Sequence, residues 1–337
     1  MKRLFGLSAI LFLAFSAKSQ QIKILTEGNK TSIRGLSVVN DKIFWASGSN
    51  GMVARSVDGG ATIGWQQIKG YEKRDFRDVE AFDSNTAIIM GVDWPAIILK
   101  TKDGGKNWYK VFEDSTKGMF LDAMEFNNQD GYVIGDPVNG KMFKAYTTDF
   151  GETWKTNTWE TDLKEGEAFF ASSGSNIKFL NFNNTLTTCY AVSGGKSSRL
   201  INLFDQKIFI LPIVQGKEST GANSIDINLK IRKGIVVGGD FMNDKDTILN
   251  CVLINFNAVN PQFSHPQTSP HGYKSCVIYT DENSLIACGT SGIDISKDGG
   301  MNWQFISNES FHVVQKAKKG SSVFLAGGKG RIAQLFF

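Results

Sequence analysis

The chain has 337 residues, of which 35 are glycine, 25 are phenylalanine and 7 are tryptophan. Its formal net charge is +4, and the lysine and arginine residues are scattered rather than gathered in a basic stripe, which argues against a nucleic-acid-binding protein. The glycine and aromatic content favours many short strands joined by tight turns over a helical protein.

The first 19 residues differ from the rest of the chain. MKR is basic, the run LFGLSAILFLAFSA that follows is apolar over about 14 residues, and Ala17 and Ser19 are small residues suited to a cleavage site. This run is shorter than the ~20 residues that span a bilayer, and no cysteine stands at the cleavage site. We therefore expect residues 1–19 to be a signal peptide without a lipid anchor and residues 20–337 to be a single domain. The mature protein is then expected to be periplasmic or secreted, with no membrane span.

From about residue 43 onwards, one kind of segment recurs along the chain. Each copy is an apolar, β-rich run that ends in a glycine or serine turn, as in IFWASGSNG, AIIMGVDWP and GIVVGGDFM. Copies begin near residues 43, 87, 131, 189, 234, 285 and 323. Their spacing of about 38 to 58 residues is typical of four-stranded propeller blades. We therefore predict an all-β fold, a seven-bladed β-propeller of four-stranded antiparallel blades.

The two ends of the chain predict how the ring closes. The last copy stops at RIAQLFF, a third strand with no fourth strand after it. Directly after the signal-peptide segment, QQIKILTEG resembles WQQIKGYEK, which we expect to be the fourth strand of the next unit. Residues 21–26 are therefore predicted to complete the last blade. Radial closure of this kind leaves only short sheet edges exposed.

A pattern S/T-x-D-x-G-x-x-W follows the predicted third strand in four of the units. It reads TKDGGKNW at 101–108, TTDFGETW at 147–154, SKDGGMNW at 296–303 and, with two extra residues, SVDGGATIGW at 56–65. The aspartate and hydroxyl side chains can bond the N–H groups of a turn, glycine can adopt a positive φ, and tryptophan buries a large ring. The residues to which we assign a structural rather than a catalytic role are Asp58, Asp103, Trp108, Asp149, Trp154, Asp298 and Trp303.

These segments resemble the Asp-boxes of BNR-repeat proteins, a group that includes sialidases and the photosystem II stability/assembly factor-like propellers. By repeat count, the resemblance covers essentially the whole chain after residue 19. In repeat layout and as a single bare propeller, the chain is more similar to the assembly-factor-like proteins. The resemblance implies boxes on the rim, away from the functional face, and an exported platform that binds a partner protein or a ligand. One fold hosts many functions, so the architecture alone establishes no activity.

Binding groups are expected on the loops that enter the innermost strands, because these loops border the central channel of a propeller. The residues predicted to bind a ligand or partner are Arg34, Arg77, Asp122, Glu167, Lys217, Glu218, Asn223, Lys274 and His312. Arginine offers a two-pronged fork to a carboxylate, sulfate or phosphate, so a protein segment, a glycan or another anionic ligand is expected. The alternative is that these charges pair with one another and fill a polar channel, since buried charges must be paired.

An enzyme is the alternative to a binding platform. Two convergent carboxylates would permit glycoside hydrolysis, and lyases of polysaccharides use tyrosine, histidine and arginine. The catalytic candidates are Arg34, Arg77, Asp78, Glu165, Glu167 and Tyr273. SIRGL places Arg34 where sialidases carry their first arginine, but the FRIP wording of that family is missing.

The cysteine and histidine content bears on metals and disulfides. None of the four cysteines belongs to a CxxC pair and the chain has only three histidines, so we expect no metal site. No dinucleotide fingerprint opens a helix, so no cofactor is expected. If Tyr279 pairs with Leu285 in a hairpin, Cys276 faces Cys288, and the two can form a disulfide in an oxidising compartment or remain buried thiols. We expect a monomer.

Overall fold

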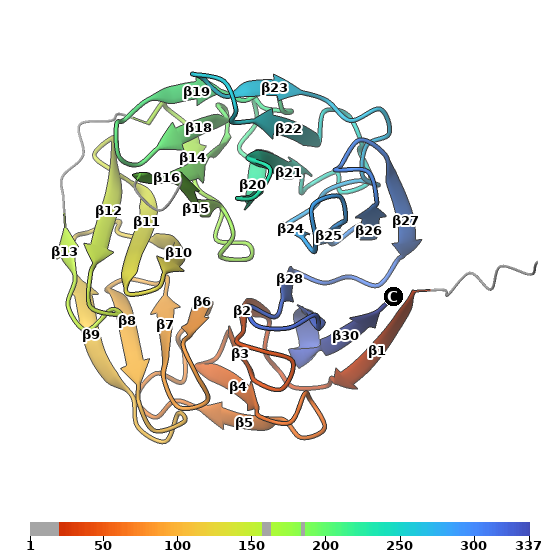
Figure 1. Cartoon of the computed structure of the whole chain (residues 1–337). Helices are drawn as coiled ribbons and strands as arrows, with labels where there is room; N and C mark the ends of the chain where they lie inside the picture. Colours follow the sequence, from red (N-terminus) through yellow and green to blue (C-terminus); the bar gives the residue numbers. More distant parts are fainter. Residues whose placement is uncertain (1–19, 157–162, 183–185) are drawn as a thin grey trace, which may run out of the picture.

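The structure is a computed structural model that describes residues 20–156, 163–182 and 186–337 (Figure 1). Its strands form seven antiparallel sheets that stand around a central axis like the blades of a propeller (Figure 1). The one helical element of the described residues is a short 3-10 turn, η1 (Gly328–Gly330). The all-β seven-bladed propeller predicted from the repeat is confirmed.

The first three blades each use four consecutive strands. Blade one contains β2 (Ile33–Val38), β3 (Phe44–Gly48), β4 (Met52–Ser56) and β5 (Gly64–Gln67). Blade two contains β6 (Phe76–Ala81), β7 (Ala87–Gly91), β8 (Ala96–Thr101) and β9 (Tyr109–Asp114). Blade three contains β10 (Leu121–Asn127), β11 (Asp130–Val138), β12 (Lys141–Thr147) and β13 (Lys155–Thr156).

The next three blades follow the same order from the innermost strand outwards. Blade four contains β15 (Ile177–Phe182), β16 (Leu186–Val192), β18 (Arg199–Asn202) and β19 (Ile208–Ile210). Blade five contains β20 (Thr220–Asn228), β21 (Lys233–Asp240), β22 (Cys251–Asn255) and β23 (Gln262–Ser264). Blade six contains β24 (Cys276–Tyr279), β25 (Leu285–Gly289), β26 (Gly292–Ser296) and β27 (Trp303–Ser307).

The seventh blade joins the two ends of the described chain. It contains β28 (Val313–Lys316), β29 (Val323–Ala326), β30 (Ile332–Phe336) and β1 (Gln21–Thr26). Strand β1 runs antiparallel to β30, with Gln21 opposite Phe336, and the two lie side by side in Figure 1. The predicted closure of the ring by residues 21–26 is therefore confirmed.

Blade five departs from the four-stranded prediction because its sheet has six strands. Two short strands, β14 (Glu167–Ala168) and β17 (Gly194–Gly195), extend it on the inner side of β20. Gly194 lies opposite Gly221 in this pairing. A Cβ added to Gly221, which has φ +124°, would stand 2.5 Å from the Cα of Gly194, so the backbones approach closely only because neither residue has a side chain.

The second strands of blades two, six and seven (β7, β25 and β29) are apolar throughout because both faces of the blade are covered. All five residues of β3, β7 and β25 are buried. Neighbouring blades meet through such side chains, and the rings of Phe44 in blade one and Phe324 in blade seven lie 4.8 Å apart. A strand buried on both sides reads as a continuous apolar run, which is why the repeat was visible in the sequence.

The four S/T-x-D segments share one hydrogen-bond pattern. Thr101 Oγ1 donates to Asp103 Oδ1 at 3.0 Å and accepts the N–H of Gly105 at 3.0 Å, and Asp103 Oδ1 accepts the N–H of Asn107 at 2.9 Å. Asp58, Asp149 and Asp298 accept the corresponding bonds in their own turns. Hydrogen bonds from Thr62, the larger effect from its hydroxyl and the smaller from its backbone N–H, lower the pKa of Asp58 to about 2. These aspartates hold hairpins between the third and fourth strands.

Residues 169–176, which connect β14 to β15, cross the centre of the ring; we call them the channel segment. Ser173 Oγ donates to the Ser275 carbonyl at 2.7 Å, and Ser175 Oγ donates to Ser224 Oγ at 2.8 Å. Ser172 lines a cavity on one side of this segment and Gly174 lines a cavity on the other. The centre of the propeller is therefore divided into two separate mouths.

Within the part of the chain that the structure describes, no helix has the length and apolar character needed to cross a membrane.

Candidate functional site

Polar residues occupy one equivalent position at the start of each innermost strand; we call these residues the channel ring. In four blades the pairing register shifts at this position, so that one residue bulges out of the strand. The bulged residues are Arg34, Arg77, Asp122 and Asn223. In the other three blades, Asn176, Ser275 and His312 stand directly before the first paired residue of the inner strand. A bulge turns its side chain out of the sheet pattern, here toward the centre.

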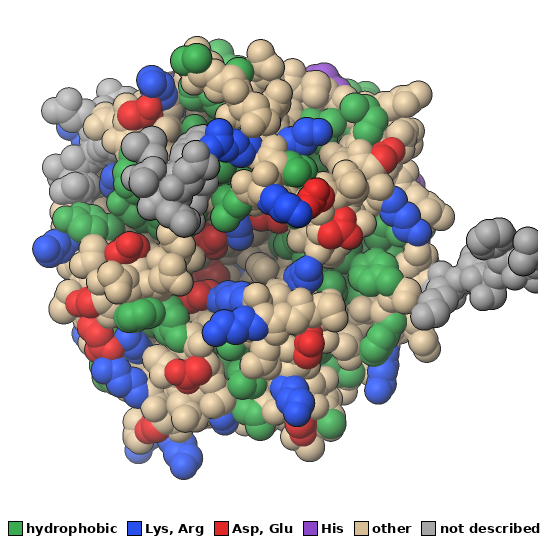
Figure 2. Space-filling model, in the orientation of Figure 1, with side chains coloured by type: hydrophobic (Ala, Val, Ile, Leu, Met, Phe, Trp, Pro, Cys, Tyr) green, Lys and Arg blue, Asp and Glu red, His purple; other side chains and the backbone are tan. Residues whose placement is uncertain are grey.

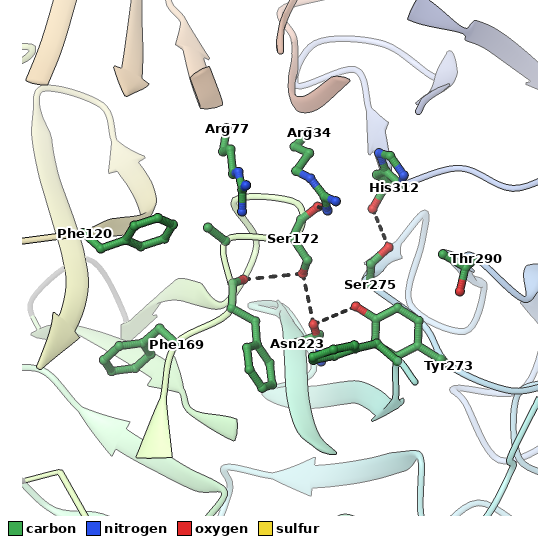
Figure 3. Close-up of a pocket in the computed structure, with 13 residues that line it drawn as sticks. Arg34, Arg77, Phe120, Phe169, Ser172, Asn223, Tyr273, Ser275, Thr290 and His312 are labelled. Carbon is green, nitrogen blue, oxygen red and sulfur yellow. Dashed lines mark hydrogen bonds between the residues drawn. The ribbon is translucent and has the colours of Figure 1, made fainter. Parts of the chain in front are cut away.

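Five ring residues open into a cavity of about 460 Å³, which we call the arginine–phenylalanine pocket (Figure 3). These five are Arg34, Arg77, Asn223, Ser275 and His312. The other lining residues are Phe120, Phe169, Phe170, Ala171, Ser172, Phe241, Tyr273 and Thr290. Of the described residues that line the pocket, none is acidic.

The two arginines give the pocket its charge. Figure 3 shows Arg34 and Arg77 projecting side by side into it. Arg34 Nη1 donates to the Ser172 carbonyl at 3.0 Å, and burial followed by the charge of Arg77 lowers the pKa of Arg34. Arg77 Nε lies 2.8 Å from Asp75 Oδ2, and its guanidinium lies 5.8 Å from the centre of the Phe120 ring. Two adjacent guanidiniums, with one carboxylate, Asp75, paired to Arg77, favour an added anion.

The remaining polar groups of the pocket are neutral, and three of them, Ser172, Asn223 and Tyr273, are hydrogen-bonded to one another. Asn223 Oδ1 accepts the Tyr273 hydroxyl at 2.8 Å and the Ser172 hydroxyl at 3.1 Å (Figure 3). Burial raises the pKa of Tyr273 to about 12, so its hydroxyl stays protonated. Burial, and then the charge of Arg34, lowers the pKa of His312 to about 4, and its Nδ1 lies 2.9 Å from the Ile33 carbonyl. At neutral pH only the arginines carry charge here.

The acidic candidate Glu167 does not enter the pocket. Its carboxylate is buried and accepts Arg199 Nε and Nη2, each at 2.7 Å, together with the Ser193 hydroxyl and the Lys164 N–H. This closed ion pair fixes the start of the channel segment to blade four. Glu165 and Glu218 are exposed and do not line the pocket either. The carboxylates of Glu165, Glu167 and Glu218 therefore do not converge on this cavity.

Asp78 lies at the other mouth, beyond the channel segment. Its carboxylate accepts the N–H groups of Met124 and Val79 at 2.7 and 2.8 Å, so it joins blade two to blade three. Burial raises its pKa well above the usual value. As a buried acceptor of two backbone bonds on the far side of the channel segment, Asp78 is not positioned to act with Arg34.

The mouth that contains Asp78 is a cavity of about 260 Å³ with mixed charge. Lys178 lies 3.0 Å from Glu125 and 3.6 Å from Asp226, and Lys318 pairs with Glu80. Acidic and basic side chains likewise surround a hollow at the centre of the face shown in Figure 2. Acidic and basic side chains therefore pair with one another at this mouth.

The structure separates the remaining candidates. Lys274 is fully buried and lies 2.7 Å from Asp294, so it is locked in an ion pair outside the pocket. Lys217 is exposed, with its Nζ 3.6 Å from the Asp240 carboxylate. Asp122 belongs to the channel ring but is fully buried and does not line the pocket; burial and then its neighbour Asp136 raise its pKa.

Sequence reasoning missed the aromatic wall of the pocket. Phe120 lies two residues before the candidate Asp122, and Phe169 and Phe170 lie just after the candidate Glu167. The sequence analysis considered the charged residues and not these rings. Two ring members, Asn176 and Ser275, were missed as well. The signal that would have found them is one polar residue at a matching place in every inner strand, at the bulge in four blades and directly before the first pair in the other three.

The predicted hairpin around Cys276 is correct, but the disulfide is not formed. Tyr279 pairs with Leu285 and Cys276 with Cys288, as expected from the turn between them. Both cysteines are nevertheless free, buried thiols, and Cys276 Sγ donates to the Val314 carbonyl at 3.4 Å. The two side chains serve as small core residues between blades.

Comparisons with known proteins agree with this architecture. Residues 63–178 match the model of the family described as photosynthesis system II assembly factor YCF48. A structure of YCF48 bound to D1 peptide has 17% sequence identity and a TM-score of 0.65, covering 96% of this chain and 97% of that chain. YCF48 from Cyanidioschyzon merolae has 15% identity and a TM-score of 0.63, covering 93% and 98%.

The fold extends to proteins with other roles. The Pan2 WD40 domain of Neurospora crassa has 14% identity and a TM-score of 0.61, covering 90% of this chain and 89% of that chain. No curated protein matches the chain. The family match covers residues 63–178, and the solved structures share the propeller fold over most of the chain.

Proposed function

We propose that this protein is a binding platform that holds a segment of a partner protein in the arginine–phenylalanine pocket. The observation that carries the proposal is the pairing of two adjacent guanidiniums with an aromatic wall in a pocket whose described lining has no acid. An acidic side chain or a terminal carboxylate of the partner would bond Arg34 and Arg77. The neighbouring side chains of the same segment would contact the phenylalanine rings.

The chemistry of the pocket favours a peptide over a small inorganic anion. Phosphate or sulfate would use the arginines but would leave the rings of Phe120, Phe169 and Phe170 without contacts. A peptide satisfies both kinds of surface, because apolar groups flank its charged ones. The structural neighbour YCF48 was solved bound to D1 peptide, which supports a peptide as the ligand class for this related propeller.

The test measures binding of immobilised 12-residue peptides, each with one Asp or Glu in a glycine–serine background, and of matched peptides with Asn or Gln. Acidic peptides should bind more tightly. Arg34→Met and Arg77→Met should each weaken that binding by roughly 10- to 150-fold, since a hydrogen bond to a charged group contributes about 1.5–3 kcal/mol. Lys102→Met is the control, because it removes one positive charge from the exposed turn of blade two. Equal binding of acidic and neutral peptides would contradict the proposal.

The carbohydrate-active alternative has less support from the pocket. A hydrolase needs carboxylates, and those of Glu167 and Asp78 are bonded elsewhere. Tyr273, the tyrosine candidate, donates its hydroxyl to Asn223 and has a raised pKa. We expect no turnover of a glycan panel by the purified protein, and turnover that is lost in Arg77→Ala would instead favour the enzyme.

We also propose that the platform acts after export, as a periplasmic or secreted protein. The support is the basic and apolar pattern of residues 1–19, which lie outside the described residues. Mass spectrometry of the protein isolated from its cells should find an amino terminus near residue 20. A mature protein that still begins at Met1 would contradict this proposal.

A further inference from the structure

One connection on the pocket side of the propeller carries exposed apolar side chains. The connection between β21 and β22 spans residues 241–250 and is the longest of those that join a second strand to a third; we call it the apolar loop. The corresponding connections in blades one and two are residues 49–51 and 92–95. Its exposed apolar residues are Phe241 at 44%, Met242 at 79%, Ile248 at 65% and Leu249 at 46% of their full accessible surface.

The apolar loop is held in place by hydrogen bonds from both sides. Asn250 Nδ2 donates to the carbonyls of Pro270 and Gly272 at 2.9 and 2.7 Å. The N–H of Tyr273 donates to the Asp244 carbonyl at 2.8 Å, and the N–H of Val214 donates to the Leu249 carbonyl at 2.9 Å. The exposed side chains therefore stand on a fixed backbone. A fixed surface binds at a lower cost in conformational entropy, and clustered exposed apolar side chains mark interaction sites.

The apolar loop continues the wall of the arginine–phenylalanine pocket without a break. Phe241 lines the pocket and is also the first residue of the loop. Its ring meets that of Phe170 edge to face, with centres 5.8 Å apart, and that of Tyr273 at 6.3 Å. A ligand that contacts these rings inside the pocket is thus directed toward Met242, which follows in the chain.

We propose that the apolar loop is the second half of the binding site and takes a large apolar side chain of the same partner segment. This proposal rests on the proposed function, in which Arg34 and Arg77 hold an acidic group. The partner is then an extended protein segment in which a leucine-, methionine- or phenylalanine-like residue lies within a few positions of an acidic one. Its side chain packs on Met242 and Ile248.

The charges on the loop argue for a protein segment over a lipid surface. Asp244, Lys245 and Asp246 stand between Met242 and Ile248, two acids against one base, and Asp246 Oδ1 accepts the N–H of Ile248 at 2.9 Å. Carboxylates within an apolar patch repel an anionic membrane, whereas surface-binding segments carry lysine and arginine on their polar side. An extended peptide can place one apolar side chain between these carboxylates.

The test uses the same 12-residue glycine–serine peptides with one Asp, now with one leucine placed at each position on either side of the Asp. Leucine should strengthen binding about tenfold at a few positions on one side only, as expected for burial of one large apolar side chain. The double variant Met242→Ser/Ile248→Ser should remove this gain and keep the Asp-dependent binding. Both side chains are exposed, so the fold should be retained, as circular dichroism would show.

Val259→Ser is the matched control, because Val259 is 99% exposed on another connection of the same blade. It should leave the leucine gain unchanged. A gain that persists in the double variant would overturn the role of the apolar loop while leaving the platform intact. If no acidic peptide binds, or if Arg34→Met leaves the Asp-dependence unchanged, the proposed function fails and this inference fails with it.

Discussion

Replacing Glu167 by alanine should destabilise the protein without a direct effect on the ligand. The carboxylate is fully buried and accepts two bonds from Arg199 at 2.7 Å, so the variant removes one side of this buried ion pair. Breaking a buried ion pair on one side costs about 3–5 kcal/mol. With an unfolding entropy of about 2.1 cal/mol/K per residue, or roughly 0.7 kcal/mol/K for a chain of this length, Tm should fall by roughly 4–7 °C.

Scanning calorimetry measures this shift, and two further variants interpret it. Glu165→Ala changes an exposed carboxylate two residues away and should alter stability by no more than about 0.5 kcal/mol. In Glu167→Met/Arg199→Met both charges are replaced by apolar groups of similar size, and most of the lost stability should return. If Glu167→Ala keeps the Tm of the parent protein but loses peptide binding, Glu167 contacts the ligand and the structural assignment is refuted.

Three more predictions concern stability, each measured by chemical denaturation. Thr101→Val should lower the free energy of unfolding by about 1–2 kcal/mol, because a buried turn N–H loses its acceptor. Asp136→Asn should raise it at pH 7 by up to about 3 kcal/mol, because burial raises the pKa of Asp136 to about 6 and the folded carboxyl resists ionisation. The stability that the protonated Asp136 carboxyl contributes is fully present below about pH 4 and is lost as the pH rises through about 6. The unfolding free energies of Asp136→Asn and the parent protein should therefore converge below about pH 4. A difference that stays constant with pH would contradict this. Gly174→Ala should lower the free energy of unfolding more than Gly118→Ala does. Both glycines have a positive φ, but only at 174 would a Cβ lie 2.4 Å from the Asp78 carboxyl. Equal losses of stability in the two variants would show that the channel segment can shift.

The architecture could be predicted from the sequence because it depends on a pattern that every blade repeats. A strand buried on both faces must be apolar throughout, and a turn between the third and fourth strands must satisfy its own N–H groups. The pairing of Gln21 with Phe336 was likewise predictable, because the last unit lacked a strand that the first residues could supply. None of these inferences depends on which side chains from different blades come into contact at the centre of the ring.

The site was harder to predict because its chemistry depends on such meetings. The rule that inner-strand loops border the centre pointed to Arg34, Arg77, Asn223 and His312, and the structure brings these together. The same rule selected Glu167, whose partner Arg199 lies 32 residues further along and removes it from the pocket. Pairing between distant residues leaves no mark in one sequence.

The channel segment explains why the two ends of the propeller offer different chemistry. A residue with a side chain at 174 would collide with the Asp78 carboxyl, and the Ser172 carbonyl on the other side accepts the bond from Arg34. The channel segment therefore contacts residues of both cavities, Asp78 on one side and Arg34 on the other, and separates the two. On one side, lysines and carboxylates neutralise one another, as Lys178 does with Glu125. On the other side, Arg77 pairs with one carboxylate, Asp75, and the adjacent Arg34 donates to the Ser172 carbonyl. An anionic ligand approaching from either end is therefore favoured only in the arginine–phenylalanine pocket, which Phe241 of the apolar loop also lines.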